Sequence, residues 1–163
     1  MITIRDIRPQ ETDAAKDVIC RCFIEFWGDE GTTLEEMRRM VDAHQGLDDV
    51  GDVRAHYFDS GGTFLAVLDG GRLVGTGALS RLSARVCELD RMWLLPEYRR
   101  QGIGHRIVRR LFAFARRHSY RTVRLHTSSD LQGAIAFYEK LGFRRIEKYR
   151  DVKYSDVFME REL

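Results

Sequence analysis

Hydrophobic and polar positions alternate at the start of the chain and then change to helical spacing. The alternation over residues 2–7 predicts a first strand that ends before Pro9. Apolar residues then recur every three or four positions over 12–27, which predicts a helix. A second helix is expected after Thr33, because Glu36 completes a capping-box pattern with it. Residues 46–62 are rich in Gly and Asp and predict a loop with a short helical turn inside it.

The rest of the chain alternates between strand and helix patterns. Apolar runs over 64–68 and 73–82 flank the turn Asp69-Gly70-Gly71, which predicts a hairpin. A third run, 86–95, stops at Pro96 because proline cannot donate to a sheet ladder. Beyond it we expect a helix over 102–118, a strand over 122–127, a helix over 130–141 that ends at Gly142, and two final antiparallel strands over 143–149 and 154–163.

This element order, β-α-α-β-β-β-α-β-α-β-β, indicates a single α/β domain over residues 1–163. No apolar run approaches the roughly 20 residues needed to span a membrane, and the N-terminus lacks a signal-peptide pattern. Cys20, Cys22 and Cys87 have no metal-type spacing and the five histidines are scattered, which favours a reducing cytoplasm and no metal site.

The junction after the 86–95 strand carries the clearest chemical signal. Arg99-Arg100-Gln101-Gly102-Ile103-Gly104 leads directly into a predicted helix. The first N–H groups of a helix have no helical acceptors, its dipole favours anions, and glycines allow close approach. Position 107 is Ile rather than the third glycine of a dinucleotide fingerprint, and no Gly-Lys-Ser/Thr of a P-loop follows. We therefore expect a diphosphate cradle of another kind.

Two motifs in this order resemble one family. Arg99-x-x-Gly102-x-Gly104 resembles the coenzyme A motif of the GNAT superfamily of N-acetyltransferases, and residues 134–143, Ala-Ile-Ala-Phe-Tyr-Glu-Lys-Leu-Gly-Phe, are similar to its second signature. The resemblance implies a GNAT fold (α+β), with a mixed central sheet of about seven strands, about four helices and a splayed V-shaped acyl-CoA cleft. It also implies that residues 1–63 form the acceptor side and 64–163 the acetyl-CoA-binding core.

The resemblance also implies which residues bind acetyl-CoA, the expected cosubstrate. Backbone groups near the end of the 86–95 strand would hold the pantetheine arm and the thioester carbonyl. The pyrophosphate would lie on the amides that follow, with two arginines and a histidine beside it. The residues concerned are Met92, Trp93, Leu94, Arg99, Arg100, Gln101, Gly102, Ile103, Gly104 and His105.

Direct transfer of an acetyl group to an amine needs a base for the amine and an acid for the departing thiolate. Tyr138 matches the tyrosine of the second signature and is the expected acid; the alternative is a packed core tyrosine. Glu88 lies at the offset where some family members carry a catalytic glutamate and is the candidate base. Asp90 shares its strand parity and is an alternative, as is a chain of waters.

Charge is unevenly distributed although the net charge is only +2. Residues 99–124 hold nine arginines and no acid, whereas 25–59 hold ten acids and three arginines. Because the resemblance places the acidic segment on the acceptor side, we expect a primary amine acceptor, with cationic small molecules and peptide or protein amines as candidates. An acidic surface that is simply solvated is the alternative.

Two other functions compete with an N-acetyltransferase. The arginine-rich helix is also compatible with a nucleic-acid-binding module, which we disfavour because those arginines lie opposite a packed stripe and CoA phosphates account for part of the charge. An acyl-CoA sensor with an inactive site is the second alternative. Homodimers are common in the family, and nothing in the sequence fixes the oligomeric state.

Overall fold

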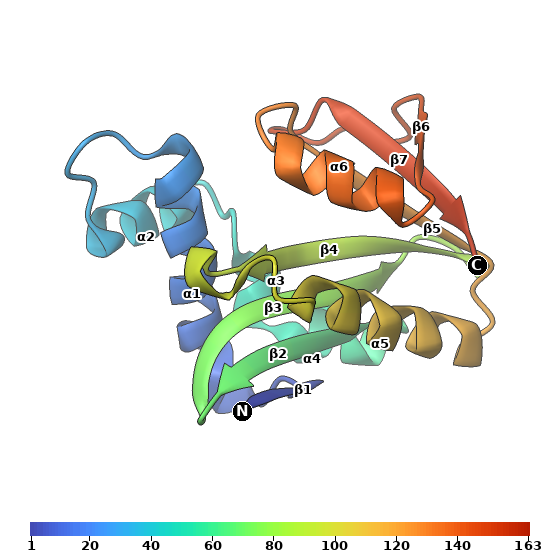
Figure 1. Cartoon of the computed structure of the whole chain (residues 1–163), viewed down its shortest axis with the longest axis horizontal. Coiled ribbons are helices and arrows are strands. Elements are labelled where there is room, and N and C mark those ends of the chain that lie inside the picture. Colours follow the sequence, from blue (N-terminus) through green and yellow to red (C-terminus); the bar gives the residue numbers. More distant parts are fainter.

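A single seven-stranded sheet forms the centre of the protein in a computed structural model that describes residues 1–163 (Figure 1). The strands are β1 (Ile2–Asp6), β2 (Thr63–Asp69), β3 (Arg72–Arg81), β4 (Val86–Leu94), β5 (Thr122–Thr127), β6 (Arg144–Ile146) and β7 (Val157–Glu162). Their order is β1-β2-β3-β4-β5-β7-β6, and every neighbouring pair is antiparallel except β4 and β5. The expected mixed sheet of about seven strands is confirmed.

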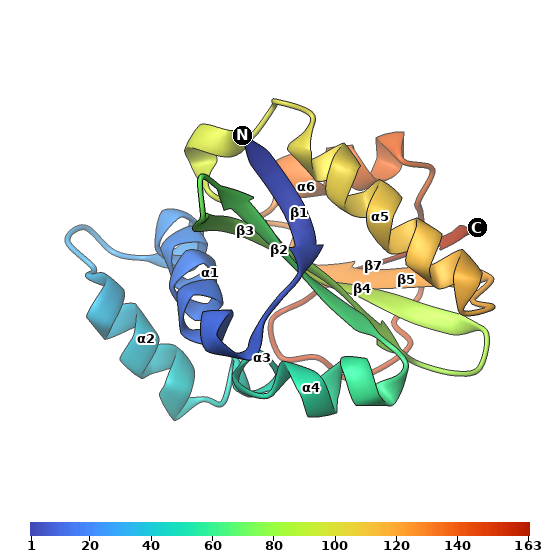
Figure 2. The same cartoon turned by 90° about the horizontal axis from the view of Figure 1, so that it is seen from below.

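Helices cover both faces of this sheet. They are α1 (Thr12–Trp27), α2 (Leu34–Ala43), α3 (Asp48–Gly51), α4 (Val53–His56), α5 (Ile103–Arg117) and α6 (Gln132–Lys140). Figures 1 and 2 show α5 and α6 on one face and α1 to α4 on the other. None of the helices is long and apolar enough to cross a membrane.

The helix count is six rather than the expected four or so, because the loop predicted over 46–62 folds into two single-turn helices. Asp52 caps the second of them by accepting a hydrogen bond from the amide of Ala55. The buried side chains of Val50 and Val53 hold both turns against the core. One buried apolar residue on each turn is too weak a sequence pattern to distinguish a single-turn helix from an irregular loop.

Local signals at the other helix ends are confirmed. Thr33 and Glu36 form the capping box at the start of α2. Gly142 follows α6 with a φ of 88°, and the amides of Gly142 and Phe143 return to the carbonyls of Glu139 and Tyr138. This Schellman arrangement ends α6 and directs the chain into β6. Strand β6 is shorter than the predicted 143–149.

Strands β4 and β5 diverge after a short common stretch. They pair only where Val86–Glu88 lies beside Thr122–Arg124, whereas β5 stays paired with β7 along its whole length. Farther along β4, the register with β3 shifts between Thr76 and Ala78, and Arg91 takes a φ of 53°. From Leu89 to Leu94 the β5-facing side of β4 therefore has no strand partner. This divergence is the V-shaped gap that the fold was expected to contain.

Candidate active site

The start of α5 presents a run of free backbone amides. No amide from Arg100 to His105 donates a hydrogen bond within the chain, and the first helical bond runs from Arg106 to Gly102. Arg100 and Gly102 both have positive φ angles, 57° and 76°, which turn successive N–H groups toward one side. Such a concave run of donors at a helix N-terminus suits an anion with several oxygens, as a diphosphate has.

The two arginines of this loop differ in their partners. Arg99 donates from Nε to the carbonyl of Leu94 at 2.8 Å and pairs through both terminal nitrogens with Glu25, at 2.8 and 2.7 Å. Its guanidinium also stacks over the ring of Phe26. Arg100 is exposed and has no partner in the chain. Arg100 is thus the free cation beside the amides, whereas Arg99 ties the loop to α1.

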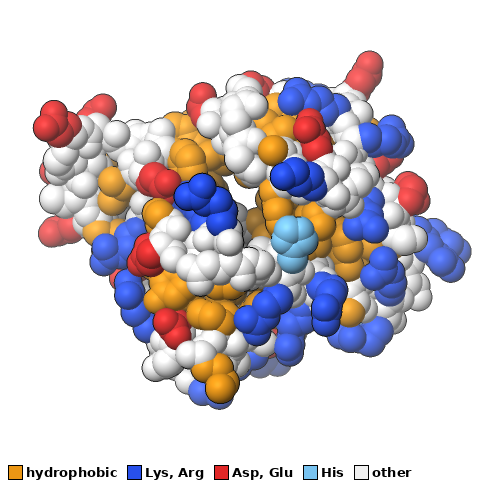
Figure 3. All heavy atoms as spheres, in the orientation of Figure 1, with side chains coloured by type: hydrophobic (Ala, Val, Ile, Leu, Met, Phe, Trp, Pro, Cys, Tyr) orange, Lys and Arg blue, Asp and Glu red, His pale blue; other side chains and the backbone are white.

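Helix α6 packs closely beside the amide run. A Cβ at Gly104 would lie 3.3 Å from the ring of Phe137, so a larger residue would push α6 away. The exposed His105 ring packs edge-on against the same Phe137 ring, with centroids 5.0 Å apart. Figure 3 shows the surface hollowed between the loop before α5 and α6, with Lys and Arg side chains on the rim. A side chain at position 104 therefore requires the Phe137 ring to shift.

The backbone of Met92, Trp93 and Leu94 borders the gap between β4 and β5. Trp93 and Leu94 pair with Thr76 and Gly75 of β3, and β5 has already diverged on the other side. Alternate N–H and C=O groups of a strand point to opposite edges, so part of this backbone faces the gap. The carbonyl of Leu94 is taken by Arg99. The structure thus places these three residues where a substrate arm can add hydrogen bonds along an open strand edge.

Tyr138 lies on α6 in a buried position at the same gap. Its side chain is 7% exposed and packs against Phe137 and Phe143, and its hydroxyl has no hydrogen-bond partner in the chain. Burial, together with the negative charge of Asp90, raises the pKa of the phenol. The Tyr138 phenol is therefore protonated at physiological pH.

Glu88 is almost fully buried, and its carboxylate is fully engaged. Arg150 donates to both of its oxygens, and the hydroxyl of Tyr149 donates to Oε2 at 2.5 Å. Both partners lie between β6 and β7, far along the chain, and no local pattern in the sequence pointed to them. Burial raises the pKa of Glu88, but the contacts with His126, Arg150 and Tyr149 outweigh it and hold the pKa below its usual value.

Asp90 has the same orientation as Glu88 but different partners. Gly77 faces Ile107 and Leu111 of α5, so the alternate positions Ser80 and Asp90 point to the opposite face of the sheet. There Ser80 donates its hydroxyl to Oδ2 of Asp90 at 2.6 Å, and no cation pairs with the carboxylate. Burial and the neighbouring Glu88 charge raise the pKa of Asp90.

His126 on β5 completes this cluster. Its Nε2 lies 3.1 Å from a terminal nitrogen of Arg150 and 3.6 Å from Oε1 of Glu88, and its Nδ1 lies 2.7 Å from the hydroxyl of Ser155. Ligand atoms of Glu88, Asp90 and His126 lie within 4.8 Å of one another. However, the Arg150 cation already occupies the Glu88 oxygens, so we assign no metal ligands here.

An aromatic cluster lies on the acceptor side of β4. Trp93 packs edge-on against Phe23 and Trp27 of α1, with centroids 5.1 and 6.2 Å apart. The indole of Trp27, 43% exposed, donates from Nε1 to Asp130 at 3.1 Å, which links the end of α1 to the loop before α6. Aromatic rings thus line the side of Trp93 that faces α1.

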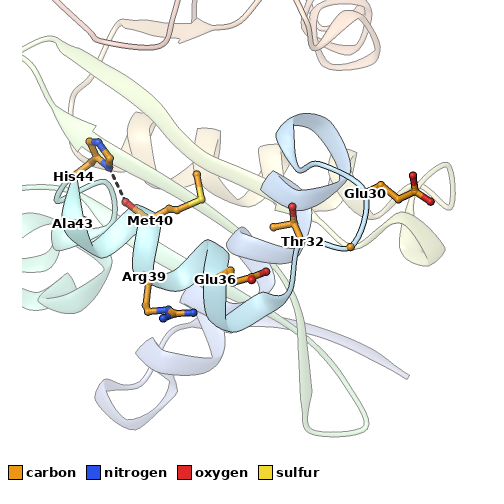
Figure 4. Close-up of a pocket in the computed structure, with 8 residues that line it drawn as sticks. Glu30, Thr32, Glu36, Arg39, Met40, Ala43 and His44 are labelled. Atoms are coloured by element: carbon orange, nitrogen blue, oxygen red, sulfur yellow. Dashed lines mark hydrogen bonds between the residues drawn. The ribbon is translucent and has the colours of Figure 1, made fainter.

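Half of the ten acids in residues 25–59 have partners or capping roles. Glu25, Asp49 and Asp59 form ion pairs, while Glu36 and Asp52 cap helices. A groove of about 690 Å³ lies along α2 (Figure 4). Glu30, Glu36 and Arg39 line it, away from β4. The acidic character is therefore concentrated at the rim around α2 rather than at the cluster on β4.

Comparison with known proteins identifies related chains. Residues 13–143 match the model of the acetyltransferase (GNAT) family. A mouse protein named probable N-acetyltransferase family 8 member 5 is 36% identical over 109 residues, which are 64% of this chain and 48% of that protein. The chain thus spans about half the length of this relative. The uncharacterized N-acetyltransferase YjgM of Escherichia coli is 29% identical over 147 residues, 88% of this chain and 83% of its own.

Solved structures share the fold. A GNAT-family acetyltransferase from Staphylococcus aureus superposes with a TM-score of 0.85 at 19% identity, over 99% of both chains. The PaiA N-acetyltransferase of Thermoplasma acidophilum, solved in complex with coenzyme A, superposes with a TM-score of 0.76 at 21% identity, over 100% of this chain and 99% of its own.

Proposed function

Because this chain belongs to the GNAT family of acetyltransferases, we propose that it transfers the acetyl group of acetyl-CoA directly to a primary amine. The observation that carries the proposal is the run of free amides from Arg100 to His105 at the start of α5, together with the open edge of β4 beyond its pairing with β5. Coenzyme A bound to the Thermoplasma protein of the same fold supports this use of the site.

The amides of Gln101, Gly102, Ile103, Gly104 and His105 hold the pyrophosphate in this proposal. Arg100 adds a charge-assisted contact, and Arg99 acts by fixing the loop to Glu25 and Leu94. His105 stands at the phosphate side as a further donor. The open backbone edge of Met92, Trp93 and Leu94 holds the pantetheine arm and polarises the thioester carbonyl.

Tyr138 protonates the departing thiolate. Its raised pKa keeps it protonated until the thiolate forms, and burial raises the pKa of a thiol as well, as it does for Cys22, to about 11. A carboxylate on β4, Glu88 or Asp90, accepts the amine proton in this proposal.

The acceptor is proposed only as a class. The acids around α2 favour a cationic acceptor such as a polyamine, an aminoglycoside or a peptide amine. Fold alone does not select among these, because the same scaffold serves many substrates.

Calorimetric titration with acetyl-CoA, followed by a thiol-release assay over a panel of amines, tests the function. We expect saturable binding, and turnover that is fastest on a cationic amine. Binding without turnover on any amine would instead support an acyl-CoA sensor. If acetyl-CoA did not bind, the amides from Arg100 to His105 would not form a coenzyme A site.

A further inference from the structure

Two carboxylates share one small region of β4. Glu88 and Asp90 point to the same face of the strand, and their oxygens lie within 4.8 Å of each other. Two negative charges at this separation in a partly dry site repel each other, so the pair holds a proton more readily than either group alone. The question is which carboxylate holds that proton.

The hydrogen-bond partners of Glu88 and Asp90 decide which carboxylate binds the proton more readily. Glu88 receives the full charge of Arg150 and a hydroxyl from Tyr149, so its ionised form is stabilised from two sides. Asp90 receives a single neutral hydroxyl from Ser80 on one oxygen, and its other oxygen has no partner. Asp90 is therefore the carboxylate that binds a proton first as the pH falls, while Glu88 remains ionised. Above its raised pKa, Asp90 is ionised and can accept a proton.

The remaining charged or titratable groups around Asp90 do not reverse this order. They come from β4 itself, the segment after α4, β5, α6 and the loop between β6 and β7, and they are Glu88, Arg91, Tyr57, His126, Tyr138, Tyr149 and Arg150. The two arginines favour an ionised Asp90, but Arg91 is bound to Asp49 and Arg150 to Glu88. Burial and the Glu88 charge dominate, and the pKa of Asp90 is raised.

Asp90 also lies just beyond the part of β4 that pairs with β5. It immediately precedes Arg91, where the register of β4 shifts, and it follows the last residue that pairs with β5 by two positions. The negative charge of Asp90 contributes to the raised pKa of the Tyr138 phenol. Glu88, in contrast, lies in the paired part of β4 and is 1% exposed.

We propose that Asp90 is the group that accepts the proton of the acceptor ammonium, and that Glu88 is a positioning residue that anchors Tyr149 and Arg150 beside it. The proposal rests on the proposed acetyltransferase function. It chooses between the two carboxylates that the sequence left open, and it gives each a separate role.

The proposed reaction begins with a proton transfer. The Asp90 carboxylate takes one proton from the acceptor R–NH3⁺ and leaves R–NH2. The amine nitrogen forms the C–N bond to the acetyl carbon, and the C–S bond breaks with its electron pair on sulfur. Tyr138 gives its proton to that sulfur and regains one from the acetylated nitrogen. Asp90 then releases its proton to water, so the net products are the amide, CoA–SH and one proton.

A comparison of pH–rate profiles tests the assignment on one fixed acceptor. Asp90→Asn should remove the acidic limb of kcat/KM and lower kcat at pH 7 by about 100-fold. Glu88→Gln should keep the limb but move it to lower pH, because the repelling charge is gone. Ser80→Ala should move it to higher pH, because ionised Asp90 loses a donor. Lys148→Gln, on the same loop as Arg150 but paired only with Asp151, should leave the profile unchanged.

Carboxyl carbon NMR of aspartate-labelled protein provides a measurement that does not depend on turnover. We expect one resonance, absent in Asp90→Asn, that titrates well above the ordinary aspartate value of about 4. An acidic limb that persists in Asp90→Asn, or an Asp90 resonance that titrates at the ordinary value, would overturn the assignment. Failure of the acetyltransferase function itself looks different, because the wild-type protein would then release no thiol at any pH.

Discussion

Arg150 donates to both carboxylate oxygens of Glu88, although the two residues are 62 positions apart in the chain. Arg150 lies in the segment between β6 and β7, and Glu88 lies at the point where β4 begins to leave β5. The ion pair therefore closes one end of the gap and fixes the β6–β7 segment over it. Loss of this contact should alter both stability and the site.

Arg150→Gln is expected to destabilise the protein by about 2–3 kcal/mol, because it leaves a buried carboxylate without its cation. Glu88→Gln in the same background should recover part of this loss, since no uncompensated charge remains. Denaturant unfolding of the two single variants and the double variant measures the coupling. Lys148→Gln removes an exposed pair and should change stability by less than about 0.5 kcal/mol. Strictly additive effects of the two substitutions would contradict a direct Glu88–Arg150 interaction.

Arg99 and Arg100 should respond differently to substitution. Arg100→Gln is expected to weaken acetyl-CoA binding by about tenfold at low ionic strength, with a smaller effect at high salt, because an exposed charge is screened. Arg99→Gln should chiefly lower the melting temperature, since it breaks the ties to Glu25 and Leu94. Calorimetry at two salt concentrations, with thermal unfolding of each variant, separates the roles. If both variants lost affinity equally and in a salt-dependent way, Arg99 would also contact the phosphates of acetyl-CoA.

Much of the scaffold was predictable because its signals are local. The capping box at Thr33 and Glu36, the turn at Gly70 and the helix stop at Gly142 each depend on a few consecutive residues. The alternation over Thr122–Thr127 gave β5 its observed limits. Such patterns can be recognised in the sequence because they depend on residues that are close together in the chain.

The detail of the site was less accessible because it depends on contacts between distant segments. The sequence made Glu88 the candidate base and left Asp90 as an alternative, since both have the same strand parity. Arg150 and Tyr149 distinguish them, and the sequence predicted only that Tyr149 ends a strand and that Arg150 follows it. Likewise, nothing in the motif itself shows that Glu25 of α1 binds Arg99.

Gly104 should tolerate little side-chain volume. Gly104→Val is expected to force Phe137 away from α5, to lower the free energy of unfolding by about 1–3 kcal/mol as overpacking does elsewhere, and to weaken acetyl-CoA binding. Gly133→Ala is the matched control, because a Cβ there meets nothing within 4 Å and Gly133 lies on α6 as Phe137 does. Titration with acetyl-CoA and thermal unfolding report the two consequences. Unchanged affinity in Gly104→Val would show that the approach of α6 is unimportant for binding.

The raised pKa of Asp90 has a defined effect on stability. A carboxyl whose folded-state pKa exceeds its unfolded value of about 4 binds more protons when folded, so the wild-type protein loses stability as pH rises through the folded pKa. Asp90→Asn has no such titration. Its melting temperature relative to wild type should therefore increase from pH 5 to pH 8, whatever the constant effect of the substitution on packing.

Thermal unfolding over this pH range measures the slope, and Asp29→Asn, an exposed acid after α1, controls for the loss of one negative charge. The expected slope belongs to Asp90→Asn alone. If the difference between Asp90→Asn and wild type were flat or fell with pH, Asp90 would be ionised throughout. Its carboxylate would then need stabilisation beyond the single hydroxyl of Ser80, and the proton shared on β4 would have to reside on Glu88.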